Sequence, residues 1–357
     1  MNIIKKFIIR SINLLFLISG IALFIYMISQ IGIGYIYTQI ENMGWKFLWI
    51  LSLHIPVLLC FTIAWFLCTG KKWKRQLFGR LFTSESAGWS MGEVLPLSAV
   101  AGEAYKGMVL KDKLESSVVI SSLILVNTIH ALVTFSMIGV GVVILFISIA
   151  ISPVIKVLII ALLLVLYFAV GLVMLRQKKG IFAPLLLSLM KIKFLKRLLQ
   201  GNVKKAAEID KKMKTFYKAN KKRFIWSYLA IWGVKLTSIL EYYLIMQFLS
   251  YPVRFDIAFL LFVISNIIFI VMFFIPSQIG VTEGGLGQSF KMLGLNPEQG
   301  VLLGVFRRLR VVVWIALGFL PALISFFTEK FRNVQNLQKT TIRNSRTKKD
   351  IAVEIIK

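Results

Sequence analysis

Two glutamates, Glu103 and Glu283, and two adjacent arginines, Arg307 and Arg308, are set within strongly apolar sequence. A carboxylate at membrane depth can bind a cationic group or neutralise an arginine. An arginine can bind a phosphate through two parallel hydrogen bonds. Ionisable side chains at that depth are costly unless protein or water surrounds them. These four residues are therefore candidates for binding the head group of a lipid.

The sequence around Glu283 is broken and rich in glycine. Residues 275–287 read IPSQIGVTEGGLG, and they follow an apolar run over 257–275 that contains one serine and one asparagine. Pro276 removes a backbone donor and ends a helix, and the glycines free the backbone to turn or to approach another segment closely. Broken backbone is tolerated at membrane depth only where protein or a watery cavity surrounds it. The pattern therefore indicates a site.

A second stretch, 95–106, has the same pattern and reads LPLSAVAGEAYK. Seven positions separate proline from glutamate in both stretches, Pro96 from Glu103 and Pro276 from Glu283. Two such patterns, one in each half of the chain, indicate an internal repeat with paired broken segments. The alternative is two ordinary loops between helices. The residues expected to shape the backbone are Pro96, Gly102, Pro276, Gly280, Gly284 and Gly285.

Other ionisable residues have a structural alternative beside the functional one. Glu241 lies inside an apolar span and is a candidate by default. Lys235 lies six residues earlier on another face of the same helix, so the two do not pair along it, and it could extend to the membrane interface instead. The structural alternative for Lys106 and the two arginines is that they are basic residues at the membrane interface. A glutamate in either motif is also explained as the cap of a helix N-terminus.

Composition indicates a polytopic membrane protein. The chain has 357 residues, of which 58% are hydrophobic, and its mean hydropathy is +0.80. The formal charge of +28 lies in loops between apolar spans, so it indicates orientation and anionic lipid rather than nucleic acid. We find no metal-ligand spacing, nucleotide motif or disulfide framework. We therefore expect no metal, no cofactor and no enzyme activity.

The hydropathy predicts an all-α protein with about six full spans. They cover 11–28, 45–68, 116–151, 154–175, 224–249 and 301–327. Basic segments place both termini and the loops 69–80, 106–113 and 176–223 in the cytoplasm, with 30–44, 150–153 and 250–256 outside. This topology predicts a cell-membrane protein.

The same topology decides how the two broken segments run. Residues 81–110 must enter and leave on the cytoplasmic side, and 257–297 on the outer side. We expect two re-entrant segments in an inverted-repeat arrangement, with their tips near the midplane. The alternative is that 257–275 crosses alone and 286–295 crosses back.

The loop over 176–223 contains 16 Lys and Arg against two acids. Its apolar residues recur near helical spacing, which predicts an amphipathic helix on the anionic cytoplasmic leaflet; a solvated basic loop is the alternative for its C-terminal part. We expect one membrane domain over 1–330 and a basic cytoplasmic tail over 331–357. Partners left open are a second copy of the chain and a separate biosynthetic enzyme.

The motifs resemble those of a known family, the lysylphosphatidylglycerol synthase transmembrane region, also called flippase-like or UPF0104 membrane proteins. Residues 275–287 resemble its Pro-Gly-Gly-x-Gly-x-x-Glu-Gly motif, 95–106 its earlier Pro…Gly-Glu…Arg motif, and 306–309 its late aromatic-Arg-Leu motif. The resemblance covers roughly residues 5–330. This chain departs from the pattern at Ser277 and Gln278, where glycines are usual, at Thr282, where a base is common, and at Lys106, which replaces an arginine.

The resemblance implies movement of a phospholipid or lipid-linked head group between leaflets. In the bifunctional relatives a soluble aminoacyltransferase domain follows the membrane part, whereas here a tail of about thirty residues with a net positive charge follows. The resemblance therefore implies transport without synthase activity. Two alternatives stay open: a membrane-embedded transferase acting on lipid-linked sugars, and a scaffold that recruits a soluble partner through 176–223.

Overall fold

In the computed structural model of the chain, the described part consists of helices joined by short loops and contains no strand. That part comprises residues 26, 29, 32–94, 98–110, 114–148, 152–192, 196, 200–272, 275 and 278–320. Most of the predicted first span, the two motif prolines Pro96 and Pro276, and the basic tail lie outside the described residues. Within these limits the fold is all-α, as the sequence predicts.

Four described segments are long and apolar enough to cross a membrane. They are the run formed by α2 (Ile33–Met43), the short turn η1 (Gly44–Lys46), α3 (Phe47–Ser52) and α4 (His54–Cys68); α7 (Ser116–Ser148); α8 (Pro153–Lys179); and α12 (Lys221–Phe248). Helices of this length and composition identify a multi-pass, all-α membrane protein.

The segment 30–44, expected as a loop outside the membrane, is helical from residue 33 onward. Helix α2 buries Ile36, Gln39 and Met43, which recur at helical spacing, and this amphipathic pattern explains why the segment is not a loop. The chain then turns at Gly44, whose φ of 47° lies in the left-handed region that glycine adopts without strain.

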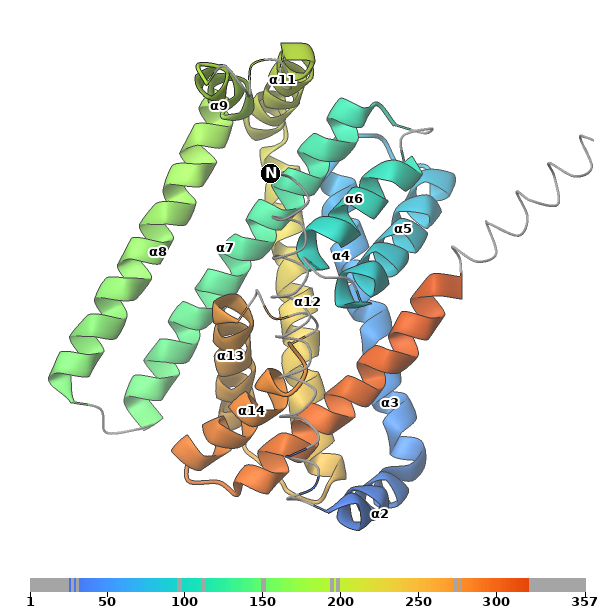
Figure 1. Ribbon diagram of the computed structural model, residues 1–357, viewed down its shortest axis with the longest axis vertical. Helices are drawn as coiled ribbons and strands as arrows, with labels where there is room; N and C mark the ends of the chain where they lie inside the picture. The colour runs from blue at the N-terminus through green and yellow to red at the C-terminus, as the bar shows by residue number, and fades with distance from the viewer. Residues whose placement is uncertain are drawn as a thin grey trace, which may run out of the picture.

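Two antiparallel helix pairs enter the bundle from opposite ends (Figure 1). The first joins α5 (Arg75–Val94) to α6 (Ser98–Leu110), and the second joins α13 (Phe255–Val271) to α14 (Val281–Met292). In each pair one proline–glycine motif begins between the two helices, and the helix ends that flank it lie toward the middle of the molecule. The two motifs therefore occupy corresponding positions in two hairpins of opposite direction.

A helix over 297–320 runs from the α14 end of the bundle back past the tips of both hairpins, and it is the orange-red helix of Figure 1. The indole N–H of Trp314 donates to the carbonyl oxygen of Leu51 at 2.9 Å, and Phe306 packs against Phe47. These contacts hold the helix against the α3–α4 run. It carries three arginines within four positions, 307–310.

The basic segments gather at one end of the bundle (Figure 1). The loop at 69–74, the start of α7, and the helices α9 (Phe182–Leu189) and α11 (Val203–Ala219) lie there, while 249–254 and α2 lie at the opposite end. The loops predicted to share a side therefore lie at the same end of the bundle, and which side of the membrane that end faces stays a prediction.

Helix α11 uses its apolar face within the protein. Met213 and Phe216 are buried, and the carboxylate of Asp210 accepts the backbone N–H groups of Ile181, Phe182 and Ala183 at 2.9–3.1 Å. Asp210 therefore caps the N-terminus of α9. The amphipathic helix is present as predicted, but its apolar residues face α7, α8 and α9 rather than lipid.

Candidate functional site

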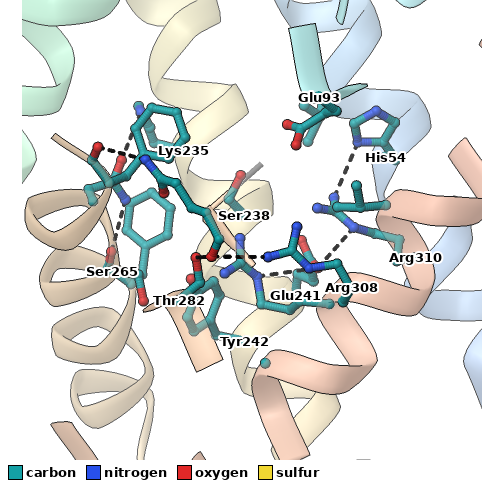
Figure 2. Close-up of a pocket in the computed structure, with 18 of the residues that line it drawn as sticks. His54, Glu93, Lys235, Ser238, Glu241, Tyr242, Ser265, Thr282, Arg308 and Arg310 are labelled. Atoms are coloured by element: carbon teal, nitrogen blue, oxygen red, sulfur yellow. Dashed lines mark hydrogen bonds and ion pairs between the residues drawn. The ribbon is translucent and has the colours of Figure 1, made fainter. Parts of the chain in front are cut away.

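A charged cavity of about 250 Å³ lies where the two hairpin tips meet α4, α12 and the helix over 297–320. The α5–α6 hairpin contributes Trp89 and Glu93, and the α13–α14 hairpin contributes Gln278, Thr282 and Glu283. Figure 2 shows side chains from these elements converging on it. Its charged lining consists of Glu93, Lys235, Glu241, Glu283, Arg307, Arg308 and Arg310.

Glu283 joins the second motif to the last helix. Gly280 begins α14 with a φ of 80°, and its N–H donates to Glu283 Oε2 at 2.8 Å. The other carboxylate oxygen, Oε1, accepts from Arg308 Nε at 3.0 Å. A Cβ on Gly304 would lie within 3.0 Å of Glu283, so glycine there permits the close approach of the two helices. Glu283 therefore caps a helix and also fixes an arginine at the cavity.

A second chain of contacts runs from α12 to α4. Glu241 Oε1 lies 3.1 Å from Arg310 Nε, and Arg310 Nη1 lies 3.2 Å from His54 Nδ1. Because a guanidinium only donates, Nδ1 is the acceptor and the imidazole proton belongs on Nε2. The His54 ring packs between Trp89 and Trp314, with ring centroids 4.4 and 4.7 Å away. This arrangement fixes the guanidinium of Arg310.

Arg307 has weaker contacts within the protein than Arg308 and Arg310 have. Its guanidinium carbon lies 4.4 Å from the centroid of the Tyr242 ring, a cation–π contact. Its Nε lies 3.8 Å from Glu241 Oε1 and makes no hydrogen bond within the described part of the chain. About a quarter of its side chain is exposed. Arg307 is therefore placed to offer hydrogen-bond donors to an anion in the cavity.

A separate charged cluster holds the α5–α6 hairpin together. Lys106 Nζ lies 2.9 Å from a carboxylate oxygen of Glu85 and 2.9 Å from Glu103 Oε1. The lysine and Glu85 are both buried. The lysine also lies over the rings of Phe61 and Trp65. Lys106 therefore pairs with one carboxylate from α5 and one from α6. The ion pair with Glu85 links the two helices of the hairpin, which is a structural role.

The comparison with protein families decides the identity of the chain. A family model described as the lysylphosphatidylglycerol synthase TM region matches residues 11–318. The chain belongs to this family. No curated protein and no solved structure matches the chain significantly. The part of the chain matched to the lysylphosphatidylglycerol synthase TM region includes both hairpins and every residue that lines the cavity.

Within this TM-region protein the structure brings together four of the residues singled out from the sequence. Glu241, Glu283, Arg307 and Arg308 all line the cavity. Glu103 and Lys106 do not line it. Glu103 instead borders an apolar groove of about 1110 Å³ between α6, α7 and α8.

Sequence reasoning did not assign to the site five charged or histidine residues that line the cavity, which are His54, Glu93, His130, Lys235 and Arg310. Two of them carried a signal. Glu93 precedes the first motif proline by three positions, so it also lies near a hairpin tip. Arg310 is the third arginine in the four positions 307–310 of an otherwise apolar helix. For His54 the sequence offers no comparable signal, because its role depends on the packing of α4 against the last helix.

Proposed function

We propose that this protein moves a phospholipid or a lipid-linked head group between the two leaflets of the cell membrane. The observation that carries the proposal is the cavity itself: seven charged side chains enclosed by apolar helices. Such a lining replaces the water that a polar head group loses on leaving the interface. The acyl chains would stay in the lipid beside the helices, so that only the head group crosses through the protein.

The proposed arrangement in the membrane is an inverted repeat of two re-entrant hairpins. Helix α13 has 17 residues, and at 1.5 Å per residue this is about 25 Å, short of the roughly 30 Å hydrocarbon core. The length favours re-entry over full crossing for the second hairpin. Entry of the two hairpins from opposite leaflets would give the head group one site that can open to either side.

The cavity supports binding of a head group that carries a phosphate. Arg307 and Arg308 supply guanidinium donors, and the carboxylates that hold the arginines keep the site from trapping an anion too tightly. The carboxylates of the lining, among them Glu93 and Glu241, are suited to an amine on the head group. We propose this transport role without bond-making chemistry.

A leaflet assay tests the proposal. Purified protein is reconstituted into liposomes that contain fluorescent phosphatidylglycerol, phosphatidylethanolamine or phosphatidylcholine, and an impermeant reductant quenches the outer leaflet. We expect the wild type to expose inner-leaflet lipid to quenching. Glu283→Gln and Arg308→Gln should slow this by about tenfold or more, which corresponds to roughly 1.4 kcal/mol.

The matched control is Glu298→Gln, which removes an exposed carboxylate in the first turn of the same last helix. It should transport as the wild type does. If both cavity variants moved lipid at the wild-type rate, the cavity would not be the path of the head group. No movement of any lipid would favour the transferase or scaffold alternatives.

We further propose that the end bearing α9 and α11 faces the cytoplasm and lies on the anionic leaflet. The exposed lysines of α11 support this proposal, and they are Lys204, Lys205, Lys211, Lys212, Lys214 and Lys218. With the apolar face of α11 used inside the protein, attraction to lipid phosphates is the interaction left to this surface, worth about 1 kcal/mol per base.

Cysteine labelling tests this orientation. In a background with Cys60 and Cys68 replaced by serine, Lys211→Cys should react with an impermeant maleimide only in inside-out vesicles, because α11 faces the cytoplasm. Arg254→Cys, at the opposite end of the bundle, should react only in intact cells or spheroplasts. The reverse pattern, or labelling of both from one side, would contradict the proposed topology.

A further inference from the structure

We propose that Lys235 is an anion site of its own, a second position at which the phosphate of the head group binds as it passes through the cavity. This inference rests on the proposed function, since it assumes that the head group enters the cavity. It assigns to α12 a step that the arginines of the last helix do not perform.

Lys235 is buried without a carboxylate to balance it. Its side chain lines the cavity, and 5% of the residue is exposed. Its Nζ donates to Asn266 Oδ1 at 3.4 Å and lies 5.8 Å from the centroid of the Phe262 ring. Among the described residues it forms no ion pair. A buried ammonium group with only a neutral amide and a ring as partners is costly unless an anion binds to it.

The other strongly buried lysine of the described chain shows what a structural lysine looks like here. Lys106 is as deeply buried, with 4% of the residue exposed. It has two carboxylates within 3.0 Å, from Glu85 and Glu103. Lys235 has the same burial and lacks such partners. The difference indicates that the partner of Lys235 comes from outside the protein.

The charges of the cavity lead to the same conclusion. Its lining has four cationic side chains and three carboxylates. Two of the cations, Arg308 and Arg310, lie within 3.1 Å of a carboxylate oxygen. Of the other two cations, Arg307 lies 3.8 Å from Glu241 Oε1, and Lys235 forms no ion pair with a described residue. The described lining therefore has an excess of one positive charge, which the single negative charge of a phosphodiester would balance.

The position of Lys235 separates it from the arginine cluster along the bundle. It lies six residues before Glu241 on α12, about 9 Å along the helix axis, toward the end that bears α11. Figure 2 shows Lys235 on one side of the cavity and Arg310 on the other, with Glu241 between them. Ser238, one turn after Lys235, also lines this path. A phosphate released by the arginines would meet Lys235 next.

A binding experiment on the full-length protein in detergent tests the inference. Dihexanoylphosphatidylglycerol and inorganic phosphate are titrated separately by calorimetry, with the wild type, Lys235→Gln and Lys235→Arg. We expect the short-chain lipid to bind the wild type, and Lys235→Gln to bind it about tenfold more weakly. Lys235→Arg should bind nearly as the wild type does, because the positive charge is kept. Lys291→Gln, which removes an exposed lysine of α14, is the matched control and should not change binding.

Thermal unfolding separates a binding role from a structural one. Because Lys235 has no carboxylate partner, Lys235→Gln should unfold at or above the wild-type temperature. Lys106→Gln should unfold at a lower temperature, because it leaves Glu85 buried and unpaired. A fall in the unfolding temperature of Lys235→Gln, as large as that of Lys106→Gln, would show that Lys235 serves the fold and would overturn the inference.

The remaining outcomes distinguish this inference from the proposed function. Equal lipid binding by the wild type and Lys235→Gln would overturn the role of Lys235 and leave the proposed transport intact. Binding of inorganic phosphate alone, lost in Lys235→Gln, would support the anion site but contradict a lipid head group as its ligand. Failure of the wild type to bind either anion would overturn both.

Discussion

Replacing Glu241 with glutamine should destabilise the protein by about 3–5 kcal/mol, the usual effect of removing one partner from a buried ion pair. The carboxylate of Glu241 lies 3.1 Å from Arg310 Nε, and both side chains are less than a tenth exposed. The substitution leaves that guanidinium buried with His54 as its remaining hydrogen-bond partner. The substitution should also abolish transport, because Glu241 is the carboxylate that Arg307 approaches as well and its loss would leave both arginines without it.

The measurement is thermal unfolding in detergent, followed by tryptophan fluorescence, for Glu241→Gln, Arg310→Met and the double variant. If the charges act as a pair, the double variant should be more stable than the sum of the two single effects predicts. If the effects of the two single substitutions on stability simply add in the double variant, Glu241 and Arg310 do not interact in the folded protein.

An exposed pair provides the matched control. Glu115, which directly precedes α7, lies 3.1 Å from Lys212 of α11, and this ammonium lowers the pKa of the glutamate. Both side chains are largely exposed, so solvent screens the interaction. Glu115→Gln should therefore unfold within error of the wild type. A loss of stability in Glu115→Gln equal to that in Glu241→Gln would mean that burial does not set the size of the effect.

The sequence predicted the arrangement of the helices better than the residues of the cavity. Helix-breaking prolines and glycines act locally, so a break between two helices could be predicted in 95–106 and in 275–287 without knowledge of the fold. The structure describes the helices on both sides of each break. The charges of the loops report which end of the bundle each belongs to, and that also needs no tertiary information. The number of full spans and the re-entry of the hairpins remain predictions.

The residue at the first hairpin tip could not be chosen from spacing alone. The equal distance from proline to glutamate drew attention to Glu103, by analogy with Glu283. In the folded hairpin, α6 places Glu103 beside Lys106, while Glu93 at the end of α5 lines the cavity. The packing of α6 against α5 decides between the two glutamates, and a repeat in sequence does not contain that packing.

The residues of α12 that line the cavity show a second limit of prediction from the sequence. Six residues place Lys235 and Glu241 about 120° apart around a helix, which predicts that the two do not pair directly. Both side chains nevertheless line the same cavity, together with Ser238 between them. A cavity bounded by several helices can cover a third of a helix surface. Facing directions along one helix therefore do not decide which residues share a site.

Replacing Gly102 with alanine should open the α5–α6 hairpin and reduce transport. A Cβ on Gly102 would overlap the carbonyl oxygen of Gly88, which belongs to the backbone of α5 and cannot rotate away. Overpacking of this kind costs about 1–3 kcal/mol. Because Trp89 directly follows Gly88 and lines the cavity, separating the helices would move the cavity wall as well as lower stability.

The control for this prediction lies on the same helix. Gly107 has no atom within 4 Å of the position that a Cβ would occupy. Gly107→Ala should leave transport unchanged and raise stability by up to about 1 kcal/mol, since alanine is the better helix former. Unfolding temperature and lipid movement are measured for both variants. If Gly102→Ala matched Gly107→Ala in both, the close contact of α5 with α6 would not position the cavity, and the hairpin would owe its place to the Lys106 cluster instead.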